Sequence, residues 1–158
     1  MDIVHEIRAS ASIWNKSGEK LKIAAIGSIV LPLRSDEDVV RLRKVVREEL
    51  TYLGFGLVDQ TKMITAASEL ARNTLKYGKG GEGHVLTLKE SARTGLELVF
   101  TDDGPGIVDI ALALTDGYTT GGGLGLGLSG AKRLSDDFML DTEPGAGTTV
   151  LIRKWKAA

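Results

Sequence analysis

The distribution of glycine limits what this chain can fold into more than any other feature of its sequence. The chain has 20 glycines among its 158 residues, whereas glycine makes up roughly 7% of an average protein. Most of them fall in four clusters between Gly78 and Gly147. Glycine is favoured where the backbone turns tightly or must approach a ligand closely. The second half of the chain is therefore expected to contain glycine turns that border a binding site.

Length and composition are those of one globular domain. A chain of 158 residues falls within the range of about 100–200 residues per domain. We expect residues 21–158 to form that domain and residues 1–20 to be a leader, either flexible or an extra strand. The chain has no cysteine, which excludes disulfides and thiolate metal sites. His5 and His84 are far apart and lack a surrounding cluster of ligands, so a zinc or haem site is not expected.

Charge and hydropathy argue against nucleic acid and membranes as partners. The formal net charge is −1, so no overall field attracts polyanions or anionic lipid. No apolar run approaches the ~20 residues that a membrane span requires. The first residues lack the basic and apolar regions of a signal peptide, so the expected location is the cytoplasm.

Apolar periodicity predicts strands that alternate with helices. Ser35 is a candidate N-cap for a helix that ends at Gly54, and Asp59 is a candidate N-cap for a second helix that ends at Tyr77. Strands are expected at 23–33, 84–89, 96–101, 138–142 and 148–155, and further helices at 107–114 and 126–134. Hairpin-paired strands with helices between them predict an α+β fold. The expected architecture is a two-layer sandwich with a mixed, mostly antiparallel sheet and helices on one face.

The second predicted helix carries a polar pair. Glu69 and Asn73 are four residues apart, so their side chains share one face about one turn apart. The amide oxygen of Asn73 is a hard ligand suited to Mg²⁺. Glu69 can orient or deprotonate an attacking hydroxyl group. Taken alone, the pair also fits a solvated helix surface.

An acidic glycine-rich segment follows the strand predicted at 96–101. Asp102 is followed by Asp103-Gly104-Pro105-Gly106. A carboxylate at the end of a strand can accept a hydrogen bond from the exocyclic amine of adenine. A glycine at position 106 would let the ring lie flat against the main chain. The same residue types also form plain turns.

The densest glycine cluster directly precedes the helix predicted at 126–134. Five glycines lie within residues 121–127, more than one turn requires. Exposed amides at a helix N-terminus form a ready site for anions, so the run is interpreted as a lid over phosphate groups. The alternating leucines argue against a disordered linker. The residues assigned to this loop are Gly121, Gly122, Gly123, Leu124, Gly125, Leu126 and Gly127.

Competing nucleotide motifs fit less well. G-x-G-x-x-G occurs as Gly125, Gly127 and Gly130, but a dinucleotide fingerprint should follow a strand within a βαβ unit. Here it follows a polar glycine loop. Neither a P-loop nor the H-R-D catalytic loop of protein kinases is present. A last glycine turn, Gly147-Thr148, opens the final strand; Thr148 could place its hydroxyl near the base through a water, although the turn alone indicates only a hairpin.

Together and in this order, the four elements resemble the sequence boxes of the Bergerat-fold (GHKL) ATPases. That superfamily includes gyrase, Hsp90, histidine kinases and MutL. Each box is weak alone, but the ordered set is specific. Over roughly residues 22–155 the chain resembles the serine/threonine kinases of the anti-sigma regulator group, closest to RsbT-type switch kinases. Ser129 stands where that group usually has proline. The matches are Glu69 and Asn73 (N box), Asp102, Gly104 and Gly106 (first glycine box), 123–128 (second) and Gly147-Thr148 (third).

The resemblance implies the Bergerat fold, Mg·ATP as cofactor, and transfer of the γ-phosphate to a serine or threonine of a STAS-domain antagonist protein. Such kinases belong to partner-switching pathways of the stress response, including the stressosome. A PP2C-type phosphatase or a sigma factor is the implied regulatory partner. By resemblance, Glu69 would be the catalytic base, Asn73 the Mg²⁺ ligand and Asp102 the partner of the adenine amine. The other implied nucleotide contacts are Gly104, Gly106, Ile107, Thr148 and the loop at 121–127.

Two other functions remain open. The first is an anti-sigma or sequestering module that binds ATP and controls its partner mainly by capture. The second is the catalytic domain of a histidine kinase. That hypothesis is poorly supported, because no dimerisation helix with a phospho-acceptor histidine precedes the ATP site. His5 lies in the short leader and is expected to be a surface residue.

Overall fold

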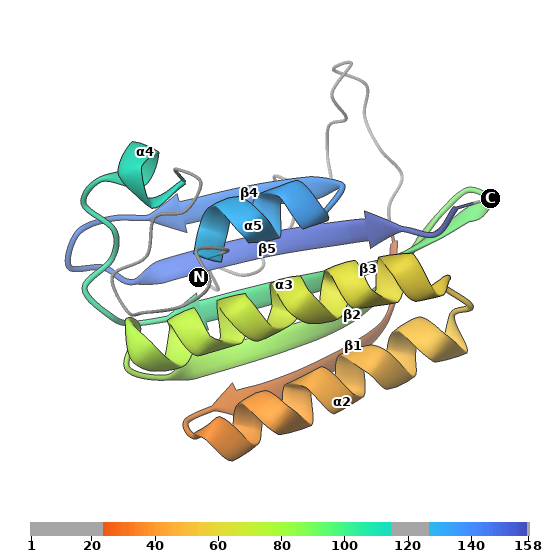
Figure 1. The fold of residues 1–158 in the computed structure, drawn as a ribbon, viewed down its shortest axis with the longest axis horizontal. Helices are drawn as coiled ribbons and strands as arrows, with labels where there is room; N and C mark the ends of the chain where they lie inside the picture. The colour runs from red at the N-terminus through yellow and green to blue at the C-terminus, as the bar shows by residue number, and fades with distance from the viewer. Residues whose placement is uncertain (1–23, 115–126, 158) are drawn as a thin grey trace.

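A computed structural model describes residues 24–114 and 127–157 of the chain. Within these residues, one five-stranded sheet has the order β1-β2-β3-β5-β4, and all four neighbouring pairs are antiparallel. The helices cover one face of the sheet (Figure 1), which confirms the predicted α+β sandwich. The sheet was predicted to be mixed, but every pair of described strands is antiparallel. The leader predicted at 1–20 lies outside the described residues. The elements are β1 Ala24–Leu33, α2 Asp36–Tyr52, α3 Leu57–Lys76, β2 Gly81–Glu90, β3 Arg93–Asp102, α4 Ile110–Ala113, α5 Gly127–Leu134, β4 Asp137–Thr142 and β5 Thr148–Trp155.

Helix α2 begins and ends where its local signals predict. The Ser35 hydroxyl accepts a hydrogen bond from the backbone N–H of Asp38 at 3.3 Å, which satisfies one of the free amides of the first turn. Three acidic residues in that turn suit the positive end of the helix dipole. At the other end, Gly54 adopts a φ of +80°, a conformation that other residues rarely adopt.

The predicted N-cap of α3 is wrong by three residues. The cap is Gly56, which provides no side-chain hydrogen bond, and the helix begins at Leu57. Asp59 lies within the first turn, where a carboxylate suits the helix dipole as well as it would at the cap. Its Oδ1 lies 3.7 Å from Nζ of Lys154 on β5. Asp59 therefore interacts both with the helix dipole and with a residue of the sheet that is distant in sequence.

Helix α4 is shorter than the predicted 107–114. The Asp109 side chain accepts a hydrogen bond from the N–H of Leu112 at 2.9 Å, as an N-cap does. The helix therefore starts after Asp109, and residues 107–109 continue the loop that leaves β3. None of the described helices is long and apolar enough to span a membrane.

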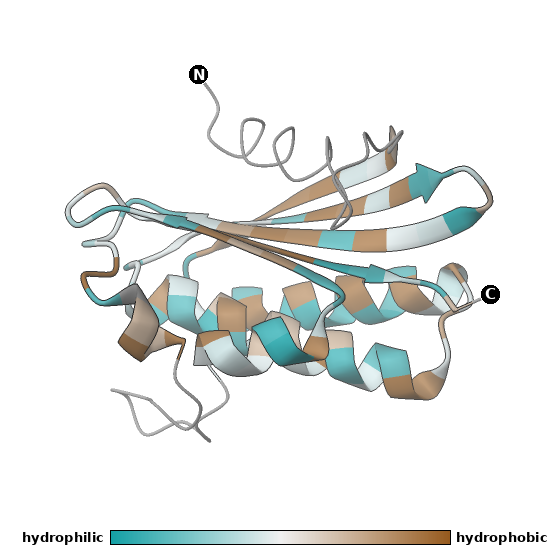
Figure 2. Cartoon of the chain, turned by 90° about the horizontal axis from the view of Figure 1, so that it is seen from above, coloured by the Kyte–Doolittle hydropathy of each residue, from teal (hydrophilic) through white to brown (hydrophobic). Residues whose placement is uncertain are grey.

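The main core lies between the helices and the sheet. Successive strand residues point to opposite faces, so Leu98 and Phe100 of β3 face the helical layer. They pack in one cluster with Met63 and Leu70 of α3, and these side chains are at most 2% exposed. Figure 2 shows the two layers edge-on, with the described helices on one side of the sheet. The core fixes the position of α3 against β3.

The opposite face of the sheet carries a second apolar cluster around a buried ion pair. Leu88, Val99 and Leu151 of this cluster are fully buried. Glu97 and Arg153 lie opposite each other in the β3–β5 register. Their Oε1 and Nη2 atoms are 2.6 Å apart, and both side chains are at most 2% exposed. The sheet is therefore buried on both faces at its centre.

Three elements converge at one end of the sheet. In the register, Asp102 at the end of β3 pairs with Gly81 at the start of β2 and with Thr148 at the start of β5. The C-terminal end of α3 lies over this end of the sheet (Figure 1). Residues from the second predicted helix, the acidic glycine segment and the last glycine turn are thereby brought together.

Candidate functional site

A cavity of about 440 Å³ opens where α3, β3 and β5 converge. Its walls come from α3, from the end of β3 and the start of β5, from residues 105–109, and from the end of α4 and the start of α5. The volume lies within the ~300–1,000 Å³ typical of small-molecule sites. Most of its lining is apolar, with a few polar groups that include Asn73, Asp102 and Thr148. The cavity is therefore the best candidate for a ligand site in the described part of the chain.

The two polar residues predicted on α3 have different positions. Asn73 lines the cavity together with Leu70 and Thr74. Glu69 does not line it: its Oε1 lies 3.3 Å from Nη1 of Arg72, and its side chain is 17% exposed. The helical spacing therefore places Asn73 at the cavity and Glu69 one turn earlier, outside its lining.

Asp102 is held at the cavity wall by glycine contacts on two sides. A Cβ on Gly78 would overlap the Asp102 carboxyl group, and the N–H of Gly104 donates to Asp102 Oδ1 at 2.8 Å. Burial raises the pKa of the Asp102 carboxyl above its ordinary value, while hydrogen bonds from the N–H groups of Gly104 and Thr148 act in the opposite direction. Asp102 and Gly104 also border a neighbouring cavity of about 680 Å³. Gly104 therefore supports Asp102 from outside the first cavity.

Gly106 and Ile107 line the cavity next to the hairpin that joins β4 and β5. Gly106 has a φ of +74°, and a Cβ there would overlap the carbonyl oxygen of Glu143. The backbone of the hairpin is thus packed directly against Gly106. The N–H of Ile107 donates to Oγ1 of Thr142 at 2.9 Å. The bare Cα of Gly106 is required by this packing, in addition to any room it leaves for a ligand.

Thr148 lines the cavity beside Asp102, and its hydroxyl lies 2.9 Å from the hydroxyl of Thr142. Gly147, before it, has a φ of +85°, and a Cβ there would overlap the carbonyl oxygen of Asp102. The last glycine turn therefore packs directly on the acidic segment. The last glycine turn and the acidic glycine segment, which are far apart in sequence, thus form one wall of the cavity.

Gly127 lines the cavity as the first residue of α5, with a φ of +37°. The rest of the glycine loop lies outside the described residues. Ser129, which stands where proline was expected, is in the first turn of α5, a position that tolerates proline. The predicted site residues outside the described part are Gly121, Gly122, Gly123, Leu124, Gly125 and Leu126.

Several lining residues were not predicted from the sequence. Gly78 was interpreted only as part of a turn after the second helix, yet Asp102 packs against it. Val108 and Leu112 line the cavity although their side chains are 85% and 43% exposed. Thr142, which contacts the lining residues Ile107 and Thr148 but does not itself line the cavity, was predicted only as a strand residue. Val108 follows Ile107, the apolar residue directly after the acidic glycine segment, and this position was its available signal, whereas Thr142 carried no local signal.

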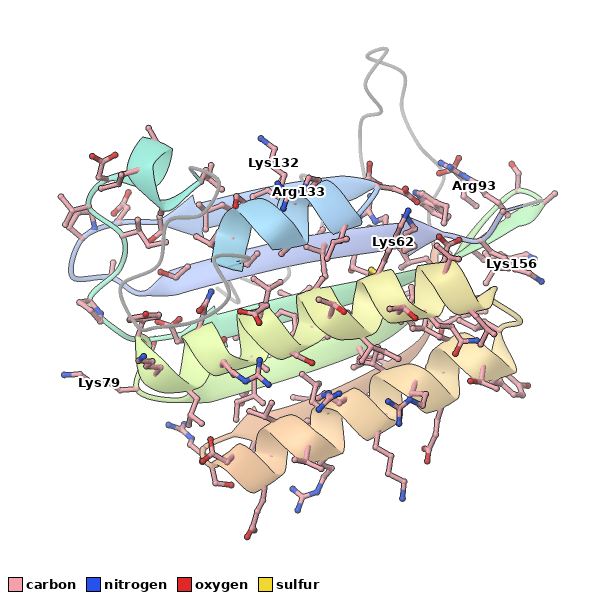
Figure 3. All side chains as sticks on the ribbon, in the orientation of Figure 1. Lys62, Lys79, Arg93, Lys132, Arg133 and Lys156 are labelled. Carbon is pink, nitrogen blue, oxygen red and sulfur yellow. The ribbon has the colours of Figure 1, made fainter. Side chains whose placement is uncertain are left out.

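Cationic side chains are unevenly placed around the cavity. Figure 3 shows Lys79 projecting from the turn between α3 and β2, at the cavity end of the sheet. Lys62, Arg93 and Lys156 lie toward the opposite end of the sheet and do not line the cavity. Within the described residues, no group of three or more His, Asp or Glu side chains could hold a metal ion. Asn73 remains the predicted cation ligand, and Mg²⁺ often binds through few protein ligands together with substrate phosphates.

Comparison with known proteins gives consistent matches. The family described as histidine kinase-, DNA gyrase B- and HSP90-like ATPases matches residues 58–158. The chain is 42% identical over 123 residues to the serine/threonine-protein kinase RsbT of Bacillus subtilis, which covers 78% of this chain and 92% of that protein. It is 32% identical over 101 residues to the anti-sigma F factor of Halalkalibacterium halodurans, covering 61% of this chain and 69% of that protein.

A solved structure shares the fold. The crystal structure of the RsbU and RsbW domains of a Mycobacterium tuberculosis protein superposes with a TM-score of 0.53 at 16% identity. The match covers 89% of this chain and 35% of that chain, so this chain spans about a third of the solved protein. At this identity the likeness concerns the fold alone.

Proposed function

The chain belongs to the family of histidine kinase-, DNA gyrase B- and HSP90-like ATPases, and on that premise we propose that it is an ATP-dependent serine/threonine protein kinase. The observation that carries the proposal is the single cavity that Asn73 of α3 shares with Asp102 of β3 and Thr148 of β5. The same three residues were predicted from the sequence, through the ordered motifs and the family that they resemble. The 42% identity to a serine/threonine-protein kinase over most of the chain supports the assignment of kinase rather than simple ATPase activity.

The adenine would bind at the Asp102 end of the cavity. The Asp102 carboxylate is an acceptor matched to the exocyclic amine, and Thr148 lies next to it. Gly106 and Ile107 form the adjoining wall, with Gly104 supporting Asp102 from behind. An apolar pocket with a few polar groups is the usual form of such a site.

The phosphates would lie between α3 and the start of α5. Asn73 is the proposed Mg²⁺ ligand, and the loop Gly121–Gly127 would wrap the phosphate groups. Support comes from Gly127, which lines the cavity as the first residue of α5, because the N-terminus of a helix is a favourable place for an anion. When bound, Mg·ATP supplies the γ-phosphoryl group and neutralises the charge that develops during its transfer.

Glu69 is proposed as the base that accepts the proton of the attacking hydroxyl. Its place one turn before Asn73, outside the cavity lining, suits a hydroxyl that is presented by another protein. Arg72 Nη1 lies 3.3 Å from Glu69 Oε1, so the ion pair restrains the side chain of the proposed base. Positioning and charge neutralisation would supply most of the rate enhancement.

The proposed substrate is a serine or threonine of a STAS-domain antagonist protein in a partner-switching pathway. A PP2C-type phosphatase or a sigma factor is the proposed second partner, and the proposed location is the cytoplasm. These assignments come from the family resemblance of the sequence motifs. The relatives, a serine/threonine-protein kinase and an anti-sigma factor, support a protein as the partner. No membrane or nucleic acid is required by the proposal.

Phosphotransfer from labelled Mg·ATP to the STAS-domain protein encoded nearest this chain tests the proposal. Wild type should label a partner serine or threonine, and both Glu69→Gln and Asn73→Ala should reduce labelling at least about 100-fold. Glu69→Gln should retain ATP binding, whereas Asn73→Ala should weaken Mg·ATP binding. Glu48→Gln on α2 is the matched control for Glu69→Gln. Thr65→Ala, two turns before Asn73 on α3, is the control for Asn73→Ala. Both should leave labelling unchanged. Full activity of Glu69→Gln would remove the assigned base.

Capture of a partner is the second candidate function. The 32% identity to an anti-sigma factor favours it. In that case wild type binds ATP and retains its partner in a pull-down but labels nothing. Asn73→Ala should then leave capture intact, since capture would use a surface away from the cation ligand.

A further inference from the structure

Thr142, at the end of β4, makes three polar contacts behind the wall of the cavity. Its Oγ1 accepts a hydrogen bond from the N–H of Ile107 at 2.9 Å and donates to the carbonyl oxygen of Gly147 at 3.1 Å. It also lies 2.9 Å from Oγ1 of Thr148. Ile107 and Thr148 line the cavity, whereas Thr142 is absent from its lining. Thr142 therefore contacts the site only through its neighbours.

A count of hydrogens decides the direction of the bond between the two hydroxyls. A hydroxyl has one hydrogen to donate and two lone pairs to accept with. The Gly147 carbonyl can only accept and the Ile107 N–H can only donate. All three contacts of Thr142 are satisfied only if its hydrogen goes to Gly147 and Thr148 donates to Thr142. The single hydrogen of Thr148 is then used, and the cavity meets its hydroxyl as an acceptor.

Asp102, the partner of Thr148 across the β3–β5 register, is also an acceptor. Its carboxylate receives the N–H of Gly104 at 2.8 Å and has no hydrogen of its own when ionised. Two acceptors therefore stand side by side at this end of the cavity. A purine with an amino group at position 6 offers them a donor, whereas a purine with a 6-keto group offers an acceptor that neither can satisfy.

We propose that Thr142 is a positioning residue that sets the preference for 6-amino over 6-keto purine nucleotides, by holding the Thr148 hydroxyl as an acceptor. The inference rests on the proposed function, because it requires a purine nucleotide in this cavity. Loss of the Thr142 hydroxyl frees the Thr148 hydrogen to turn toward the ligand. The Thr148 hydroxyl can then donate to a keto group as well as accept from an amino group, and the preference for 6-amino purine nucleotides falls.

Dissociation constants of ATP, GTP and ITP for wild type, Thr142→Val and Thr142→Ser test the proposal. Wild type should favour ATP over both keto nucleotides. Thr142→Val should lower the ATP-to-GTP and ATP-to-ITP affinity ratios about tenfold, and Thr142→Ser, which keeps the hydroxyl, should restore them. Thr149→Val is the matched control: its hydroxyl bonds Thr101 at 3.4 Å and is outside the cavity lining, so stability should change while the ratios do not.

The outcomes are distinguishable. Unchanged ratios in a folded Thr142→Val, or failure of Thr142→Ser to restore them, would overturn the role of Thr142 and leave the ATP-binding proposal standing. Wild type that binds neither ATP nor GTP would overturn the proposed function and the inference with it. If Thr142→Val does not fold, Thr148→Val removes the same acceptor from the cavity side, and retention of the wild-type ratios there would also overturn the inference.

Discussion

The carboxyl group of Asp102 occupies the space that a side chain on Gly78 would need. Gly78 follows the C-cap of α3, and Asp102 ends β3. The contact joins the helix that carries Asn73 to the strand that carries the proposed adenine partner. The position and orientation of Asp102 in the cavity therefore depend on a glycine 24 residues earlier in the sequence.

Gly78→Ala should displace the Asp102 carboxyl group. We expect the free energy of unfolding to fall by about 1–3 kcal/mol, as in other overpacked interiors, and ATP affinity to fall as well. Gly27→Ala is the matched control, because a Cβ there would lie 3.8 Å from its nearest neighbour, Thr87 Oγ1. Its effect should stay within about 0.5 kcal/mol. Thermal denaturation with and without Mg·ATP measures both the stability and the ATP affinity of each variant. Equal shifts of the unfolding temperature in Gly78→Ala and Gly27→Ala would contradict the packing argument.

The raised pKa of Asp102 should give stability and nucleotide affinity opposite pH dependences. The folded state binds this proton more tightly than the unfolded state, so the contribution of Asp102 to the free energy of unfolding should fall as pH rises from 3.8, its ordinary pKa, through the raised value. ATP affinity should rise over the same window, because the adenine amine needs the ionised carboxylate. Titrations from about pH 4 to about pH 7 measure both.

Asp102→Asn separates these effects from the titration of other groups. The amide carries no ionisable proton, so this variant should lose both pH dependences that Asp102 contributes. It should also bind ATP at least about tenfold more weakly at neutral pH. A variant that keeps the wild-type pH profile of ATP affinity would assign that profile to another residue.

Removal of one member of the buried Glu97–Arg153 pair should destabilise the protein more than removal of both. Arg153→Met leaves the Glu97 carboxylate buried without its guanidinium, and should cost about 3–5 kcal/mol. The double variant Glu97→Leu/Arg153→Met should recover much of that loss, since apolar side chains suit the surrounding Val99 and Leu151. Urea denaturation measures the cycle. Additive single effects would show that the two side chains do not stabilise each other.

Ser35→Ala should shorten or fray the start of α2. The hydroxyl accepts the N–H of Asp38, and loss of such a cap typically costs about 1 kcal/mol. Ser28→Ala, at an exposed position of β1, is the control and should change the unfolding midpoint little. Because neither Ser35 nor any residue of α2 lines the cavity that contains Asn73 and Asp102, ATP affinity should be unchanged in both; a loss confined to Ser35→Ala would show that α2 supports the site.

Local signals predicted most of the elements. The last strand was predicted at 148–155 and is observed at Thr148–Trp155, because alternation and a glycine turn define it within its own residues. The cap at Ser35 was correct for the same reason. Asp59 was misplaced as a cap because an acid in the first turn and an acid at the N-cap have similar sequence signals. The ion pair with Lys154 is invisible without the sheet.

The residues of the candidate site also divide into those that the sequence predicted and those that only the fold revealed. The ordered motifs and the family resemblance predicted Asn73, Asp102 and Thr148 as site residues, and the fold brings all three to one cavity. Glu69 remains a predicted base beside that cavity. The spacing did not reveal Gly78, whose packing against Asp102 comes from the meeting of two separate elements.

The sequence by itself determined the α+β pattern, the helix boundaries set by glycine and serine, and the residue types of the nucleotide boxes. Those features depend on side chains within one or two turns of each other, so they can be recognised from spacing. Only the tertiary structure decided that Thr142 accepts from Ile107, 35 residues away, and that Glu97 and Arg153, 56 residues apart, are paired and buried. Such contacts depend on strand register, which is set by the packing of the whole sheet.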